Sequence, residues 1–290
     1  MSARQPDEES TMIRRTLLSA FLPLALLAPF AHGESASAPA SAPVAAVPAG
    51  EKAVQKVRSA YLDGWDQVPL QVLEAQAAKY RGTYYLEGLH NTKRIALTFD
   101  DGPSGYTRSL LKVLAKHEVK ATFFELGEHV ASNPDDARAV LAAGHTIANH
   151  SYDHPYLNKL GNEQVWDKQL LRAEQVFKDK LGIRPALMRP PYGALTDEQV
   201  AAIGARGYKA ILWSVDTQDW FHALHLGADE AIYRSVLSYV HPEAIVLMHD
   251  GGGKRSGTVE AVDRMIPELK KQGYEFVTVD QLIGVKPYLD

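Results

Sequence analysis

From residue 93 onwards, short apolar runs alternate along the chain with longer stretches whose apolar residues recur at helical spacing. Continuous apolar runs are typical of strands buried on both faces, as in a parallel sheet covered by helices. The runs that predict strands are Ile95–Thr98, Ala121–Phe124, Thr146–Ala148, Ala186–Arg189, Ala210–Ser214, Ala244–Leu247 and Phe276–Val279. The stretches that predict helices are Tyr106–His117, Pro134–Ala143, Glu163–Lys180, Thr196–Arg206, Asp229–Val240 and Val259–Lys271.

This repetition predicts an α/β fold. Seven strand–helix units favour a closed or nearly closed (β/α) barrel of about seven parallel strands over an open sheet. Glycines such as Gly144 and Gly207 follow several helical stretches, and glycine commonly ends helices. In barrels of this kind the chemistry lies at the C-terminal ends of the strands. Polar residues directly after each strand are therefore the candidates for function.

The N-terminal part of the chain has the pattern of an export signal. Arg14 and Arg15 precede an apolar core over residues 17–31, and Ala31-His32-Gly33 resembles a cleavage site. The core is too short to span a bilayer. We therefore expect a signal peptide at about residues 12–33, within the segment 1–33. The mature protein would be periplasmic or secreted and would lack a lasting membrane anchor. An uncleaved anchor is the alternative, and acidic residues before Met12 leave the start at either Met1 or Met12.

Three further segments come after the expected signal. Residues 34–50 are almost entirely Ala, Ser and Pro, a composition that cannot bury a core and predicts a linker. Residues 51–90 have apolar positions at helical spacing, including Val54, Val57 and Leu73, and predict an N-terminal helical extension. Residues 91–290 form the expected catalytic domain.

The amino-acid composition limits the kinds of site that the protein can form. The 290 residues are 46% hydrophobic, which suffices for a sizeable core, and they include no cysteine. Disulfides and thiol chemistry are therefore excluded, and any metal site must use histidines and carboxylates. The formal net charge of -4 argues against a nucleic-acid partner. The oligomeric state stays open.

Polar residues do gather at the predicted strand ends. Asp100 and Asp101 end the first strand, and Gly102-Pro103 stops it at once. A straight strand would point these two carboxylates to opposite sides, so the turn is expected to let them converge. The candidates after later strands are His150, His154, Arg189, Tyr192, Asp216, Asp219, Trp220, His249 and Asp250.

His150 and His154 are four residues apart and would share one face of a helical turn. Together with a strand-end aspartate they would make a three-ligand metal site with positions open for water and substrate. Zinc is the first expectation, and Co²⁺, Mn²⁺ or Ni²⁺ would also suit. The same ligand set also describes a non-haem iron oxygenase.

An aspartate pair allows a division of labour. One carboxylate can bind the metal while the other accepts a proton from water. Arg189 could hold the free carboxylate ionised, or it could belong to a structural ion pair. His249 could act as a general acid, with Asp219 fixing its tautomer. Asp250 is expected either to have a structural role or to support the site residues from behind, and Asp216 has no assigned role.

Five segments, in this order along the chain, resemble the motifs of a known protein family. Thr98–Pro103, His150–Pro155, Arg189–Gly193, Asp216–Trp220 and Leu247–Asp250 resemble the five ordered motifs of the polysaccharide deacetylases. This is carbohydrate esterase family four, with a nodulation-factor deacetylase-like domain. The resemblance spans about residues 90–285, and no motif residue is missing.

The resemblance implies a deformed (β/α) barrel. It also implies a metal-dependent hydrolase that removes acetyl groups from N-acetylglucosamine polymers such as peptidoglycan, chitin or an exopolysaccharide. Each motif residue carries an implied role. Asp100 resembles the catalytic base, and Arg189 resembles the residue that orients it. Asp101, His150 and His154 resemble the metal ligands, and the backbone N–H of Tyr192 resembles the donor to the oxyanion. Asp219 resembles the partner of the catalytic acid His249, and Trp220 and Leu247 resemble the walls of the acetyl pocket.

Three alternatives stay open. The same machinery could remove O-acetyl groups from acetylated xylan, because its residues act on the carbonyl and do not distinguish an amide from an ester. A catalytically silent carbohydrate-binding domain is a second alternative, which the presence of Asp100 and His249 disfavours. A metal-dependent oxygenase is a third, disfavoured by the additional carboxylate and the acid histidine.

Overall fold

The computed structural model describes residues 52, 54–60, 62 and 67–290. The predicted signal peptide (1–33) and linker (34–50) lie outside these residues and stay predictions. Within the described residues, no helix is long and apolar enough to cross a membrane.

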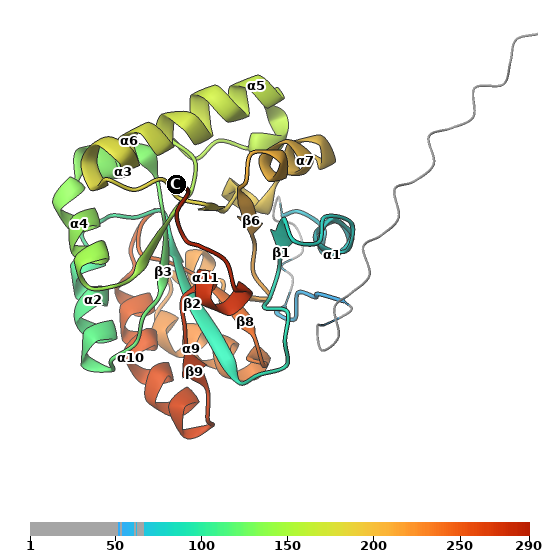
Figure 1. The fold of residues 1–290 in the computed structure, drawn as a ribbon. Helices are drawn as coiled ribbons and strands as arrows, with labels where there is room; N and C mark the ends of the chain where they lie inside the picture. Colours follow the sequence, from blue (N-terminus) through green and yellow to red (C-terminus); the bar gives the residue numbers. More distant parts are fainter. Residues whose placement is uncertain (1–51, 53, 61, 63–66) are drawn as a thin grey trace, which may run out of the picture. The chain divides into compact units, whose positions relative to one another are not determined.

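One parallel sheet forms the centre of the described part of the chain (Figure 1). Its strands follow the order β1-β6-β5-β4-β3-β2-β8-β7, and β9 pairs with the start of β2 on the side opposite β8, which β3 occupies further along the strand. The order places β1 at one end of the sheet and β7 at the other. The strands are β1 (Tyr84–Tyr85), β2 (Arg94–Asp100), β3 (Thr122–Glu125), β4 (Thr146–Asn149), β5 (Leu187–Met188), β6 (Lys209–Ile211), β7 (Val215–Asp216), β8 (Ala244–His249) and β9 (Glu275–Phe276).

Helices surround this sheet in Figure 1. The longer ones are α1 (Leu70–Lys79), α2 (Thr107–Lys116), α4 (Pro134–Ala142), α6 (Leu171–Leu181), α7 (Asp197–Ala205), α9 (Ala228–Tyr239) and α10 (Ser256–Lys271). The shorter ones are α3 (Gly127–Ser132), α5 (Asn162–Gln164), α8 (Asp219–His222) and α11 (Val279–Ile283), with single turns η1 (Leu157–Lys159) and η3 (Pro191–Gly193) and a π-helical stretch η2 (Val165–Leu170).

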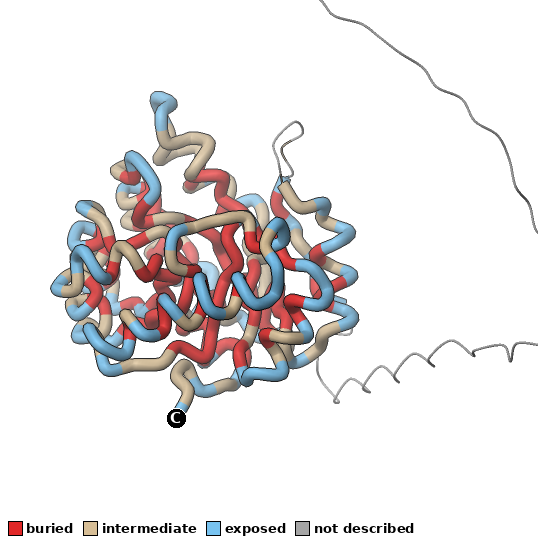
Figure 2. The backbone as a smooth tube through the Cα atoms, turned by 90° about the horizontal axis from the view of Figure 1, so that it is seen from above, coloured by how far each residue is buried: buried red, intermediate tan, exposed pale blue. Residues whose placement is uncertain are grey.

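Alternation along β2 divides the core into two layers. Ile95, Leu97 and Phe99 face outward and pack against helices in one apolar cluster. Ala96 belongs to a second cluster with inward-facing residues of other strands and with Leu282 of α11. Because α11 packs against this inner cluster, it fills the interior of the curled sheet. Figure 2 shows buried backbone in the middle of the described part and exposed backbone around it.

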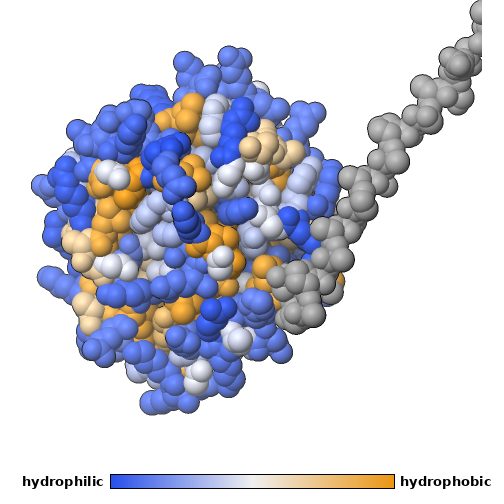
Figure 3. Space-filling view, in the orientation of Figure 1, coloured by the Kyte–Doolittle hydropathy of each residue, from blue (hydrophilic) through white to orange (hydrophobic). Residues whose placement is uncertain are grey.

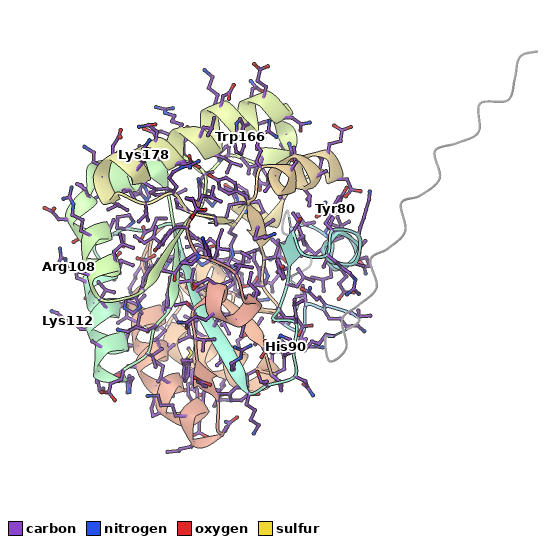
Figure 4. The ribbon with its side chains drawn as sticks, in the orientation of Figure 1. Tyr80, His90, Arg108, Lys112, Trp166 and Lys178 are labelled. Atoms are coloured by element: carbon purple, nitrogen blue, oxygen red, sulfur yellow. The ribbon has the colours of Figure 1, made fainter. Side chains whose placement is uncertain are left out.

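The outer faces of the helices are polar. On α2, Leu110 and Leu114 are buried, whereas Arg108 and Lys112 are exposed and point away from the sheet (Figure 4). In Figure 3, hydrophilic side chains accordingly project around the margin of the described part. This is the pattern expected of helices that cover a buried sheet.

The structure confirms the predicted class and the seven predicted strand regions, and it corrects some details. The run Ala210–Ser214 does not form one strand: β6 ends at Ile211, and β7 begins at Val215 and pairs with β8 instead. The two-residue strand β1 and the short helices α3, α8 and α11 were not predicted.

The expected helical extension over residues 51–90 is only partly helical. Helix α1 covers Leu70–Lys79, whereas residues 54–60 are not helical. The backbone N–H of Arg58 donates to the Ser214 carbonyl at 2.7 Å, and the side-chain oxygen of Gln55 accepts from the Leu86 N–H at 2.7 Å. We call residues 54–60 the strap. Its backbone and side chains bond to chain segments at both ends of the sheet, next to β7 and directly after β1.

A buried acidic centre holds the strap in place. Glu87 is fully buried and forms ion pairs with Lys52 and Arg58, and its Oε1 also accepts from the Lys56 N–H at 3.1 Å. His241 Nδ1 lies 3.5 Å from Glu87 Oε2. Donors from the protein thus surround this carboxylate, so the centre is a structural one.

Candidate active site

Asp100 and Asp101 lie where β2 ends. Asp100 continues the inward-facing positions of the strand. Asp101 has a φ of 70°, a left-handed conformation that is uncommon for residues other than glycine. This turn reverses the strand alternation, so both carboxylates point into one site. The predicted convergence of the pair is therefore present in the structure.

Asp101, His150 and His154 form one cluster, with a potential ligand atom of each lying within 4.8 Å of the others. Asp101 Oδ1 lies 3.5 Å from His150 Nε2 and 3.3 Å from His154 Nε2. The helical turn predicted from the spacing of the two histidines is wrong. They lie on the loop after β4, where Ser151 and His154 both have positive φ and fold the loop tightly.

The donor set of this cluster fits a divalent metal ion. His150 Nδ1 donates to the Arg189 carbonyl at 2.8 Å, which orients the ring so that Nε2 faces Asp101. Asp101 Oδ1 is buried without a hydrogen-bond partner. Burial lowers the pKa of His154 to about 4, so this ring is neutral at pH 7. A buried carboxylate oxygen without a hydrogen-bond partner, facing the Nε2 atoms of two histidines, is suited to hold a cation.

Arg189 holds the other aspartate. Its Nη1 donates to Asp100 Oδ1 at 2.6 Å and to Thr98 Oγ1 at 2.8 Å. The same guanidinium donates to the carbonyls of Ile211 and Leu212, at 3.0 and 2.9 Å, and is fully buried. Asp100 Oδ1 is therefore fixed, and Oδ2 points toward the cluster, 3.7 Å from His150 Nε2.

His249 and Asp219 form a second pair. His249 Nδ1 lies 2.6 Å from Asp219 Oδ1, while Asp219 Oδ2 accepts from the His249 N–H and the Thr258 hydroxyl, both at 2.8 Å. Burial alone would lower the pKa of His249, but the charge and hydrogen bond of Asp219 raise it to about 9. The imidazole is therefore protonated at neutral pH, with Nδ1–H directed at Asp219.

A cavity of about 430 Å³ joins these groups. Asp100, Asp101, His150, His154 and His249 line it, as do the predicted Tyr192, Trp220 and Leu247. Arg189 and Asp219 lie behind the lining, each in contact with a residue that faces the cavity. The structure therefore brings all ten predicted site residues together.

Comparison with known proteins identifies the family. Residues 88–211 match the model of the polysaccharide deacetylases. A peptidoglycan-N-acetylglucosamine deacetylase of Bacillus cereus is 38% identical over 201 residues, which are 69% of this chain and 71% of that protein. The chain belongs to the polysaccharide deacetylase family. The family predicted from five short segments is thereby confirmed.

Two further matches extend this comparison. A peptidoglycan-N-acetylglucosamine deacetylase of Listeria monocytogenes serotype 1/2a is 44% identical over 195 residues, 67% of this chain but 40% of that protein. The chain therefore spans less than half the length of this relative. A solved peptidoglycan N-acetylglucosamine deacetylase superposes with a TM-score of 0.68 at 34% identity, covering 71% of this chain and 95% of the other. The deformed barrel expected for the family is thus also confirmed.

Several side chains of this deacetylase-family site were missed in the sequence. Trp213 and Tyr156 line the cavity, and the Tyr156 ring stacks on that of Tyr192 with centroids 3.8 Å apart. Tyr156 directly follows His154-Pro155, so its position after a strand could have indicated it. Thr258 and the strap residues gave no such signal, because their contacts to the site are distant in sequence.

The two acidic residues without an assigned catalytic role occupy different positions. Asp216 lines the cavity, and burial raises its pKa to about 6. Asp250 is buried behind the site and accepts a hydrogen bond from Thr107, the first residue of α2. This contact ties the end of β8 to α2, consistent with the structural role expected for Asp250.

Proposed function

We propose that this protein removes acetyl groups from N-acetylglucosamine units of a polysaccharide, with peptidoglycan as the first substrate to test. One observation carries the proposal. A cation site of Asp101, His150 and His154 shares a single cavity with a carboxylate fixed by Arg189 and with an imidazolium fixed by Asp219. Amide hydrolysis needs a base for water and an acid for the departing amine.

Asp100 is the proposed base. Because Oδ1 is held by Arg189, Oδ2 remains to accept a proton from the attacking water. The positive charge of Arg189 lies against this carboxylate and fixes its position. His249 is the proposed acid: it is protonated at neutral pH and can give its Nε2 proton to the nitrogen as the C–N bond breaks. The products are acetate and a free amine.

The remaining motif residues would orient the acetyl group. Trp220 and Leu247 line the cavity beside His249 and would enclose the methyl group in an apolar pocket. The backbone N–H of Tyr192 is the proposed donor to the oxyanion, and one such donor contributes about 10²–10³ in rate. Stacking on Tyr156 fixes the ring of Tyr192 and thereby the backbone turn η3, which carries the Tyr192 N–H.

Asp101, His150 and His154 would hold a divalent ion, for which we propose Zn²⁺, with Co²⁺, Mn²⁺ or Ni²⁺ as alternatives. When bound, the ion supplies Lewis-acid polarisation of the amide carbonyl and of the attacking water. The His150 Nδ1–H bond to the Arg189 carbonyl orients the ring for this role. Binding would also satisfy the buried Asp101 oxygen that has no hydrogen-bond partner.

The substrate proposal rests on the two curated relatives, which are peptidoglycan-N-acetylglucosamine deacetylases. An exported protein would meet such a glycan, and the signal predicted at residues 12–33 agrees with this. We therefore also propose a periplasmic or secreted location. Mass spectrometry of the protein isolated from its cell would find a mature N-terminus near Glu34. An intact N-terminus on a cytosolic protein would contradict the location.

Acetate release tests the function. The purified protein, stripped with a chelator and reloaded with Zn²⁺, should release acetate from peptidoglycan or from N-acetylglucosamine oligomers. Acetylated xylan is the matched substrate for the alternative O-deacetylase activity. Acetate from xylan alone would support that alternative. Glycan binding without acetate from any substrate, at full metal loading, would support the silent binding domain and overturn the proposal.

A further inference from the structure

One wall of the cavity comes from residues that precede the family match. Val57, Ser59 and Ala60 of the strap line the cavity together with Val68 and Leu70 near the start of α1. The family match begins at residue 88, so this wall is built by the segment in front of it. Most of these side chains are apolar, and Val57, Val68 and Leu70 pack against a core cluster that includes Leu73 and Leu212.

The strap is fixed where it meets the cavity. The Arg58 N–H donates to the Ser214 carbonyl at 2.7 Å, and the Asp216 N–H donates to Ser59 Oγ at 2.8 Å. Gln218 Nε2 donates to the Ala60 carbonyl, also at 2.8 Å. Three consecutive strap residues are thus bonded to β7 or to the chain beside it. A segment held by so many directional bonds presents a defined surface to a ligand.

The order of strands places this wall across the open end of the curled sheet where the site lies, which we call the mouth. β1 and β7 are the two ends of the sheet, and the strap bonds to segments beside both. β4 and β3 lie furthest along the sheet from these ends, and the loop after β4 carries His150, His154 and Tyr156. A glycan that crosses the mouth from Tyr156 past the cation site therefore runs toward the strap.

We propose that the strap closes the exit between the two ends of the sheet and confines the glycan to one side of the unit that loses its acetyl group. The enzyme would then prefer short oligosaccharides and chain ends over units within a polymer. This inference rests on the proposed deacetylase function and adds the direction in which the substrate extends.

The position of deacetylation within an oligomer tests the strap directly. The Zn²⁺-loaded protein is incubated with an N-acetylglucosamine hexamer labelled at its reducing end, and tandem mass spectrometry locates the free amine. Wild-type protein should place the free amine at one chain end or next to it. Deacetylation of internal units as fast as of end units would overturn the proposal.

A pair of matched double variants separates the wall from general destabilisation. Val57→Ala/Val68→Ala shortens two side chains that line the cavity. Val54→Ala/Val72→Ala makes the same change on the same two stretches, at side chains that are 57% and 42% exposed. The first variant should raise internal relative to terminal deacetylation about tenfold, whereas the second should leave the ratio unchanged. Equal ratios in the two variants, at equal melting temperatures, would overturn the proposal.

A binding measurement keeps this test independent of turnover. Calorimetry with Asp100→Asn protein and oligomers of two to six units should show an affinity that stops rising after the shortest lengths. Adding Val57→Ala/Val68→Ala should let the affinity rise further with length. If no substrate releases acetate but this length dependence is seen, the proposed reaction fails and the closed exit stands. An affinity that rises steadily to six units in the Asp100→Asn protein would reject the closed exit.

Discussion

Two of the buried acidic centres in the described part of the chain differ in how their charges are compensated. Glu87 is surrounded by Lys52, Arg58 and the Lys56 N–H, so donors from the protein compensate the carboxylate. Asp101 faces His150 and His154, and its Oδ1 has no hydrogen-bond partner. Both centres tie segments distant in sequence together, but only the second leaves a buried acceptor oxygen unsatisfied.

The difference indicates what each centre is for. An unsatisfied buried oxygen costs about 1–3 kcal/mol, more when the group is charged. Beside Asp101 Oδ1, the Nε2 atoms of two histidines are placed to share a cation that would remove this cost. The Glu87 centre therefore fixes the strap, and the Asp101 centre is suited to hold an ion. Substitutions at and around the two centres test this contrast, beginning with the largest expected effect.

Removing a ligand should abolish activity. His154→Ala takes away one of the two imidazole nitrogens beside Asp101 Oδ1. We expect metal affinity to fall by at least about tenfold, with acetate release reduced to background. Metal analysis and the acetate assay check this. His90→Ala, at an exposed histidine labelled in Figure 4, is the control and should retain both. Full metal content in His154→Ala would remove the site as described.

Asp100→Asn separates proton transfer from metal binding. The amide keeps the shape of the side chain but cannot accept a proton from water, so activity should fall by about 10²–10⁴ while metal affinity stays near that of wild type. Asp101→Asn is the matched variant on the neighbouring residue. It should weaken metal binding and recover part of its activity at high metal concentration. Opposite behaviour of the two variants would exchange their roles.

Glu87→Gln should destabilise the fold and leave the metal in place. The change leaves Lys52 and Arg58 without their buried counter-charge. Breaking a fully buried pair costs about 3–5 kcal/mol, but both cations reach solvent here, so we expect about 1–3 kcal/mol. Urea unfolding measures this free energy. A loss of metal at unchanged stability would show that the two centres are not distinct.

Asp219→Asn should move the alkaline limb of the activity profile. Asp219 raises the pKa of His249 to about 9, and the acid must be protonated to act. Activity is therefore retained below this pKa and lost as the pH rises through it. Without the carboxylate the limb should move to lower pH, by about one to two units. The pH dependence of kcat measures the shift. Thr258→Val, which removes one hydrogen bond to Asp219, should move the limb less, and an unmoved limb in Asp219→Asn would assign the acid elsewhere.

Much of the fold could be predicted because its signals are local. The apolar run of β2 and the turn at Gly102-Pro103 indicate both a strand and a site at its end. β1 could not be predicted in this way: two tyrosines are too few to show a period, and they form a strand only because they pair with β6. The prediction for the strap failed for a related reason. Val54 and Val57 have helical spacing, but bonds to Leu86 and Ser214 hold the backbone in another conformation.

The site could be predicted as a set of residues but not as a geometry. Strand ends indicated Asp101, His150 and His154, yet the two histidines converge through a loop with positive φ at Ser151 and His154, not along a helix. Spacing alone does not reveal such a loop. Trp213 was also missed, because an apolar residue within a predicted strand has no feature that distinguishes the cavity from the core.

Arg189 serves both the interior of the protein and the site with one side chain. Its guanidinium bonds to Thr98 of β2, to the carbonyls of Ile211 and Leu212, and to Asp100, while lying over the ring of Phe124. Folding yield and turnover are therefore not separable traits at this position. A library screened for soluble expression would discard variants of Arg189 before their catalysis was ever measured, and a screen for activity would score the same variants as inactive whatever the cause.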